Sequence, residues 1–227
     1  MDINIRHAVL EQLYTIYDTF SQTLDVACQR YCSQCCTCNV TLTTLEAHRI
    51  IGHLLETGQS DLLEKLESKV PEKRFQPKIT TNGIADYCTQ GKPLPEEESD
   101  AAWGTCPFLE QNECPLYLAR PFGCRCFVSK QLCGESGYAD VDPFVITVNN
   151  VFLQYIEHID AQGYSGNLSD VLRFMRDEKN RGQYEAGTLN PPADDLLIPN
   201  RPLKVLMIPP EHRDRIAPIL EAIQKIR

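Results

Sequence analysis

Residues 28–46 read Cys28-Gln-Arg-Tyr-Cys32-Ser-Gln-Cys35-Cys36-Thr-Cys38-Asn-Val-Thr-Leu-Thr-Thr-Leu-Glu46. Five of the 11 cysteines of the chain lie in the first part of this stretch. Two thiolates separated by two residues can close on one metal through a tight turn, so this spacing is typical of metal ligands. Cys32, Cys35 and Cys38 have the spacing of the first three ligands of a bacterial ferredoxin-type run. The fourth position of that run is Leu42, so a fourth ligand must come from another part of the chain.

Cysteines resume in segment 106–133, where Cys106 and Cys114 each precede a proline. The proline lacks a backbone donor and constrains the local turn, as in ferredoxin runs. Closing a loop of roughly 70 residues between the two blocks costs only a few RT, and metal binding supplies far more free energy. We therefore expect one metal-binding core that joins both blocks. The candidate thiolate ligands are Cys28, Cys32, Cys35, Cys36, Cys38, Cys106, Cys114, Cys124 and Cys126.

The two blocks contain no histidine, although the chain has five. An all-thiolate ligand set fits both a zinc ion held by four cysteines and a [4Fe–4S] cluster. Arg120 and Arg125 would offset the negative charge of such a site and donate hydrogen bonds to sulfur. The alternative is that these arginines anchor a loop through backbone carbonyls. Tyr117 is either a further contact of the cofactor or packing around it.

The cysteine pattern resembles that of the YkgJ-like family of bacterial cysteine-cluster proteins, which are described as zinc- or iron-chelating. The first family segment, C-x2–3-C-x2-C-C followed by V-x-L-T-x-x-E, is matched by Cys28, Cys32, Cys35, Cys36, Val40, Leu42, Thr43 and Glu46. The second, C-P-F-L, a cysteine and Y-x-x-R-P-x-x-C-R, is matched by residues 106–109, Cys114, Tyr117, Arg120, Pro121, Cys124 and Arg125. The resemblance spans residues 28–127 and implies a metal-chelating domain. Its ligand register omits Cys38 and so disagrees with the ferredoxin-like register.

The composition argues against several classes of protein. The 227 residues include 31 acidic and 22 basic side chains, for a net charge of −9, whereas sequence-independent nucleic-acid binding and docking on anionic lipid need clustered cations. No apolar run exceeds four residues, and a membrane-spanning helix needs about 20. The N-terminal residues lack the apolar region of a secretory signal. We expect a cytoplasmic protein that binds neither nucleic acid nor membrane, because so many cysteines without an export signal indicate a reducing compartment.

Apolar periodicity predicts a mainly α fold, with helices packed around an irregular cysteine-rich metal-binding core. A first helix is expected over residues 3–31. Its apolar stripe would be Val9, Leu13, Ile16, Phe20 and Leu24. Thr43 and Glu46 form a capping box that predicts a helix to about residue 57, with Gly58 as its stop. Further helices are expected at 61–70 with Ser60 as cap, from 142 to the glycines at 163 and 166, from Asn167 or Ser169 to about 179, and at 211–227.

The remaining segments are expected to be irregular. Residues 71–105 and 186–203 are proline-containing and lack periodicity, which predicts loops. Residues 39–42 and 205–208 are expected to be extended. Residues 1–140 would form the cysteine-cluster domain, with 141–227 as a helical C-terminal extension packed on it, or the whole chain would form one continuous domain.

Three functions are compatible with these cysteines. The first is a [4Fe–4S] protein with a redox or cluster-dependent role. The second is a structural zinc module for interactions, without catalysis. The third is a thiol-based metal carrier or redox sensor. Cys28, Cys32 and Cys35 also have the C-x3-C-x2-C spacing of radical enzymes, but such an enzyme needs repeated strand–helix units that this short, helical pattern lacks. Whether the protein is an enzyme stays open at this point.

Overall fold

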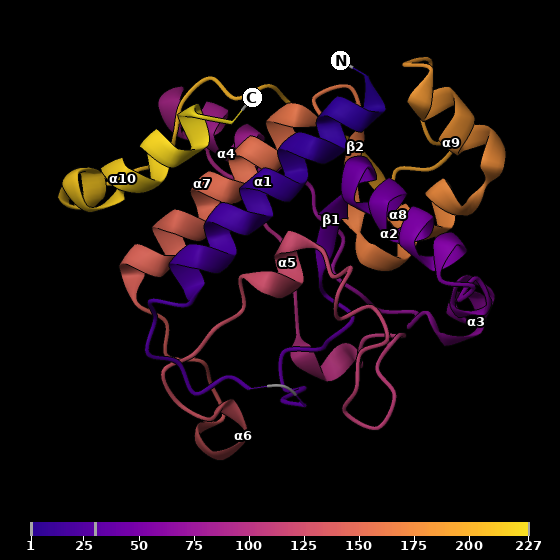
Figure 1. The fold of residues 1–227 in the computed structure, drawn as a ribbon, viewed down its shortest axis with the longest axis horizontal. Coiled ribbons are helices and arrows are strands. Elements are labelled where there is room, and N and C mark those ends of the chain that lie inside the picture. The colour runs from indigo at the N-terminus through magenta and orange to yellow at the C-terminus, as the bar shows by residue number, and fades with distance from the viewer. Residues whose placement is uncertain (1, 30, 227) are drawn as a thin grey trace.

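The computed structural model describes residues 2–29 and 31–226, and within them the predicted mainly helical fold is confirmed (Figure 1). The α-helices are α1 Ile3–Ser21, α2 Thr44–Glu56, α3 Asp61–Lys69, α4 Thr81–Thr89, α5 Phe122–Arg125, α6 Cys133–Ser136, α7 Pro143–Ile159, α8 Leu168–Arg176, α9 Glu178–Glu185 and α10 Arg213–Gln224. Two short 3-10 helices span Ala101–Trp103 and Pro210–His212. The strands are β1 Thr41–Thr43, β2 Tyr164–Asn167 and β3 Leu197–Pro199.

The long helices α1 and α7 run side by side and form one layer of the molecule (Figure 1). The buried apolar face of α1 consists of Leu10, Leu13, Tyr14 and Tyr17. The predicted stripe is confirmed in part, because Leu13 is buried and Val9, Ile16 and Phe20 are partly buried against the core. Leu24 lies beyond the end of the helix. The two tyrosines turn inward since their hydroxyls donate to polar partners, Tyr14 to the buried Glu46 and Tyr17 to the partly buried Asn149, each at 2.8 Å.

Helix α1 ends at Ser21, so the prediction that it runs into Cys28 was wrong. The hydroxyls of Ser21 and Thr23 donate to the carbonyls of Asp18 (2.9 Å) and Phe20 (2.7 Å). These bonds satisfy the last carbonyls of the helix locally, as side chains near a helix terminus often do. The segment that carries the first cysteines is consequently irregular.

The capping box that starts α2 is confirmed. The Thr43 hydroxyl accepts from the Glu46 amide (3.3 Å), and the Glu46 carboxylate accepts from the Thr43 amide (2.9 Å). Gly58 follows the helix with a φ of +68°, the left-handed conformation expected of a glycine stop. Ser60 occupies the N-cap position of α3 as predicted, although its side chain makes no cap hydrogen bond.

The three strands form a small antiparallel sheet in the order β1-β2-β3. Leu42 pairs with Gly166, and Gly166 pairs with Leu197 on its other side. The sheet therefore connects the segment after the first cysteine block to the segment after α7. One hydrophobic core includes side chains of α1, α2, α7, α8 and α10, so both predicted halves of the chain contribute to it.

Two predictions about the irregular segments were wrong. Helix α4 lies within the predicted loop 71–105, and apolar periodicity does not reveal it because its buried residues include Asn82, Gly83 and Asp86. The single helix predicted to end near residue 179 is divided at Asp177, whose carboxylate caps α9 through the Lys179 amide (2.8 Å). Asn167 caps α8 as expected.

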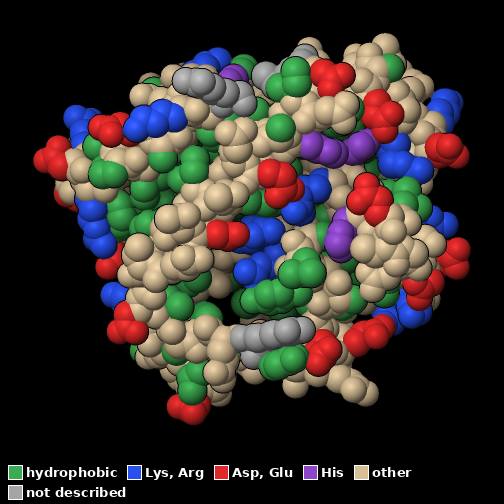
Figure 2. Space-filling view, viewed as in Figure 1, with side chains coloured by type: hydrophobic (Ala, Val, Ile, Leu, Met, Phe, Trp, Pro, Cys, Tyr) green, Lys and Arg blue, Asp and Glu red, His purple; other side chains and the backbone are tan. Residues whose placement is uncertain are grey.

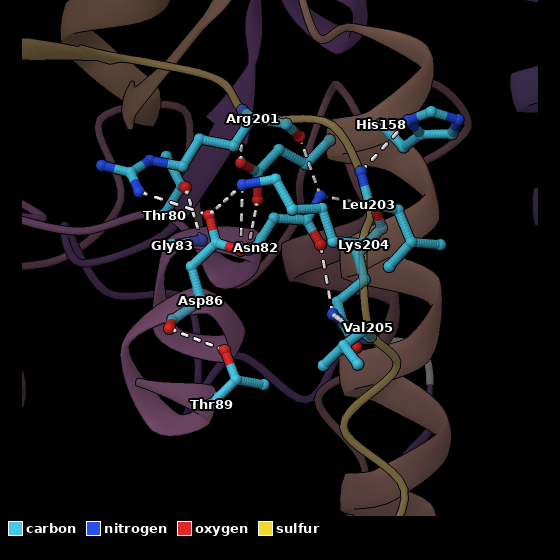
Figure 3. A network of polar contacts seen from close by, with 12 residues as sticks. Thr80, Asn82, Gly83, Asp86, Thr89, His158, Arg201, Leu203, Lys204 and Val205 are labelled. Carbon is cyan, nitrogen blue, oxygen red and sulfur yellow. Dashed lines mark hydrogen bonds and ion pairs between the residues drawn. The ribbon is translucent and has the colours of Figure 1, made fainter. Parts of the chain in front are cut away.

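Residues 205–208 do not form the predicted strand. Their backbone carbonyl and amide groups form hydrogen bonds with a side chain of α7 instead of with another strand. Gln154 of α7 donates to the Val205 carbonyl (2.8 Å) and accepts from the Met207 amide (2.9 Å). Figure 3 shows the same arrangement at Leu203, whose amide points to the His158 ring. The strand that pairs in the sheet is β3, further upstream. Among the described residues, none of the helices has the length and apolar character needed to cross a membrane.

Candidate metal centre

The two cysteine blocks lie next to each other in the irregular part of the molecule, around α5 and below α1 in the view of Figure 1. The Cys106 amide donates to the Cys36 carbonyl at 2.8 Å, and an antiparallel bridge continues this contact. At the other end of the first block, the Ala27 amide donates to the Ser129 carbonyl at 2.8 Å. Backbone hydrogen bonds therefore hold the first block against the second at two points.

A cavity of about 320 Å³ lies between these segments. Figure 2 shows this face of the molecule, which is hollowed where the irregular segments lie, with Lys or Arg side chains on the wall of the hollow. The cysteines that line the cavity are Cys28, Cys32, Cys35, Cys36, Cys106, Cys114 and Cys124. Tyr117, Arg120 and Arg125 line it as well. All but two of the predicted site residues therefore share one cavity.

The thiols surround the cavity without converging on one point. Within residues 2–29 and 31–226, no three His, Cys, Asp or Glu side chains form a group that could hold a metal ion as they stand. The metal-binding core itself thus stays a prediction. The donor set fits a thiophilic cofactor, because seven thiols and no histidine line the cavity. Rotation of the cysteine side chains between staggered rotamers is the motion that would bring sulfur atoms inward.

Helix α5 holds Cys124 at the cavity through its neighbour Phe122. The Phe122 ring is buried, with its centroid 4.7 Å from that of Tyr17 on α1 and 5.6 Å from that of Phe152 on α7. Its amide donates to the buried carboxylate of Glu46 at 2.7 Å. Sequence reasoning assigned Glu46 to the capping box and missed this second role, because only the fold brings residue 122 to the start of α2.

Burial makes most of the cavity thiols weak acids. Desolvation raises the pKa of Cys106 to about 11 and that of Cys124 well above its usual value. The pKa of Cys36 is lowered instead, because its neighbour Cys35 donates a hydrogen bond to it. Without a cation these buried thiols are mostly protonated at neutral pH. A metal must displace their protons, since a coordinating thiol is deprotonated.

Arg125 anchors a loop, the alternative considered for both arginines. Its guanidinium forms an ion pair with Asp18 (3.1 Å) and donates to the carbonyls of Arg120 (3.1 Å) and Leu118 (3.3 Å). It also lies over the Tyr14 ring at 4.3 Å. Its donors therefore bind groups of the protein itself.

Arg120 has a different environment from Arg125. Its guanidinium lies 4.1 Å above the Tyr117 ring, and both side chains line the cavity. Its Nε atom is buried and has no hydrogen-bond partner among the described residues. The charge of Arg120 lowers the pKa of the thiols of Cys35 and Cys114, although other effects on them are larger. A buried donor without a partner suits a sulfur acceptor in the cavity.

Cys38 and Cys126, the other two predicted ligands, do not line the cavity. The Cys38 thiol is buried and donates to the Lys73 carbonyl at 3.6 Å. The Cys126 thiol donates to the Gly123 carbonyl at 3.6 Å. The structure thus brings together the cysteines of the family register and separates Cys38 of the ferredoxin-like register from them. Sequence reasoning did not identify Ser129, whose carbonyl accepts a hydrogen bond from the first block. A single serine in a loop is not part of any recognisable motif.

Gly123 sets the close approach of α5 to β1. A Cβ atom at this position would lie 2.8 Å from the Thr41 carbonyl oxygen, closer than real Cβ contacts allow. We expect Gly123→Ala to shift α5, to lower stability by roughly 1–3 kcal/mol and to lower metal content, although no ligand is removed. Metal analysis and denaturant unfolding measure both effects. Gly52→Ala is the control, since nothing lies within 4 Å of its Cβ position, and a Gly123→Ala protein with full metal content would contradict the expectation.

In comparisons with protein-family models, curated proteins and solved structures, no match to this chain is found. The family resemblance consequently rests on the residues themselves.

Proposed function

We propose that this protein binds a metal cofactor through thiolates from both cysteine blocks, most favourably a [4Fe–4S] cluster. The observation that carries the proposal is the cavity between the blocks, where seven thiols gather from segments far apart in the sequence. Cysteines that only pack in the core would be expected to be spread over the structure rather than to line one cavity. We also propose that the chain belongs to the YkgJ-like family and works in the cytoplasm, where cysteines stay reduced.

Such a cluster supplies one-electron transfer when bound. The residues of the chain would prepare the cavity for it in two ways. Arg120 offers positive charge and a buried donor that has no partner in the protein, which would stabilise the net negative charge of a thiolate-ligated cluster. Arg125 and Phe122 hold the loop and helix that carry Cys124. A redox or cluster-dependent role follows from this chemistry.

A structural zinc ion is the second candidate. Four thiolates satisfy the tetrahedral geometry of zinc as well as the corners of a cubane cluster. The observation in favour of zinc is that helices α5 and α6, which frame the cysteine region, have only four residues each and gain most from a cross-link. In that case the protein is an interaction module, and the metal only maintains the shape of the surface.

Anaerobic purification followed by visible spectroscopy and by iron, sulfide and zinc analysis tests the proposal. We expect a brown protein with a broad band near ~400 nm and about four irons and four sulfides per cluster. The variant Cys124→Ser should lose this band, whereas Cys88→Ser should keep it, because Cys88 is exposed on α4 and does not line the cavity. A colourless zinc protein would select the second candidate. A protein without metal, before and after anaerobic reconstitution with iron, sulfide or zinc, would refute both.

A further inference from the structure

We propose that the cysteine region contains two metal sites, and that the outer site binds a single zinc-like divalent ion. The thiols of this outer site are Cys28, Cys32, Cys35 and Cys133. The thiols of the inner site are Cys36, Cys106, Cys114 and Cys124. The inference rests on the proposed function, because the inner set is the one that would hold the proposed cofactor. Cys133 is not part of the family pattern and does not line the cavity. The proposed function therefore gives it no role.

The turn around Ser129 brings Cys28 and Cys133 to the same place. The Cys28 thiol donates to the Ser129 carbonyl (4.0 Å), and the Cys133 thiol donates to the Gln131 carbonyl (3.9 Å). The two halves of this turn are tied together, since the Ser129 hydroxyl also donates to the Gln131 carbonyl at 2.8 Å. Ser129 itself is buried, with 1% of its surface exposed. Both thiols therefore flank one fixed turn.

Helix α6 also packs on the middle of the first cysteine block. A Cβ atom built on Gly134 would lie 3.5 Å from the side-chain amide of Gln34, which is ordinary van der Waals contact. Gln34 lies between Cys32 and Cys35 in the sequence. The thiol of Cys133, the first residue of α6, is thereby held near this part of the block. Cys28 lies within electrostatic range of the thiols of Cys32, Cys35 and Cys133.

The inner set is held by different contacts. The Cys106 amide bonds to the Cys36 carbonyl, and α5 brings in Cys124 through the buried Phe122 ring. Cys36 lies within electrostatic range of Cys106, Cys124 and Cys114, and it also accepts a hydrogen bond from the Cys35 thiol of the outer set. Cys35 and Cys36 are adjacent in sequence, so the boundary between the two sets falls at this pair. One tetrathiolate site cannot use eight thiols, whereas two sites use all eight.

The exposure of the outer thiols favours zinc at that site. Cys28 and Cys35 are exposed, and Cys32 and Cys133 are half-buried. Zinc has no redox chemistry and stays bound in four-thiolate sites near the surface, as in many small structural domains. The ion would fasten the irregular segment after α1 to α6, where the described hydrogen bonds are few.

Titration of the full-length apo protein with Co²⁺, in the presence of a competing chelator, tests this assignment. Cobalt replaces zinc in thiolate sites and gives a visible absorption. We expect two equivalents of Co²⁺ in the wild type and in Cys88→Ser, and one equivalent in Cys133→Ser and in Cys124→Ser. The double variant should bind none. The chelator ensures that a site with three thiolates is counted as lost.

The outcomes separate this inference from the proposed function. One equivalent in the wild type that is lost in Cys124→Ser but kept in Cys133→Ser would overturn the outer site and leave the proposed function intact. Loss of both equivalents in either single variant would indicate one shared site and also overturn the inference. No bound Co²⁺ in the wild type would overturn the two-site inference, and the iron, sulfide and zinc analysis would then decide the proposed function separately. Circular dichroism checks that each variant is folded, and Cys133→Ser changes a half-buried residue of a four-residue helix that has no buried residue.

Discussion

Complete removal of the metal is expected to lower the melting temperature of the whole chain by at least about 10 °C, in a single transition. Structural zinc binding is worth about 10–16 kcal/mol in small domains, and a typical folded protein is stable by only about 5–15 kcal/mol. For a chain of this size, 1 kcal/mol corresponds to about 2–4 °C. Even part of the metal-binding free energy therefore produces a large shift.

The transition should be single because the site is joined to the helical core. Phe122 contacts the Tyr17 and Phe152 rings, and its amide bonds to Glu46 of α2. Loss of the metal loosens α5, and α5 shares these buried contacts with α1, α2 and α7. Cooperative unfolding of the cavity together with the core follows from this packing.

Calorimetry under anaerobic conditions, before and after chelation, measures the effect. Metal analysis must establish that removal is complete, and re-addition of the metal should restore the original melting temperature. Cys88→Ser should melt like the wild type, since Cys88 is exposed and does not line the cavity. An unchanged melting temperature after complete removal would show that the metal does not join the two blocks.

The second large effect is expected at Asp160, where Asp160→Ala should lower the free energy of unfolding by about 3–5 kcal/mol. This carboxylate is fully buried at the end of α7. Its donors, at 2.5–3.5 Å, are Thr44 Oγ1, Leu45 N, Tyr184 Oη, Asn200 Nδ2 and Arg6 Nη1. The alanine variant removes the acceptor of Thr44, Leu45 and Tyr184 and leaves the Arg6 guanidinium buried without its counter-ion. Asn200 keeps its bond to the Asp160 carbonyl.

Denaturant unfolding at neutral pH measures the loss. Asp160→Asn keeps the size of the side chain and one acceptor, so it should be less destabilising than alanine. Asp195→Ala, an exposed position, serves as the control and should change stability by no more than about 0.5 kcal/mol. A loss below about 1 kcal/mol in Asp160→Ala would mean that water or a local rearrangement satisfies these donors.

Local signals in the sequence predicted local structure well. The capping box at Thr43 and Glu46, the glycine stop at Gly58 and the start of a helix at residue 142 depend on a few neighbouring residues. Caps and stops act through backbone groups of the same turn, so their geometry follows from nearby residue types alone. Apolar periodicity did not predict a helix whose buried residues are mostly polar or small. Helix α4 was missed for that reason.

Long-range contacts decided what the local signals left open. The strand predicted at 205–208 is absent because Gln154 binds that backbone from a distant helix. Arg120 and Arg125 have similar sequence surroundings, but it is Arg125 that forms an ion pair with Asp18 near the end of α1. The secondary-structure propensity of a segment does not predict such long-range hydrogen-bond partners, since they depend on which elements pack together.

The sequence by itself determined that the fold is mainly helical and that ten cysteines concentrate in two blocks, because periodicity and spacing are properties of short segments. Only the tertiary structure decided which thiols line the common cavity. Cys38 and Cys124 are equally plausible ligands by spacing. The position of each thiol depends on how its neighbouring residues pack in the core. Phe122 is buried against α1 and α7, and this places Cys124 at the cavity. The Cys38 thiol instead bonds to the Lys73 carbonyl, outside that wall.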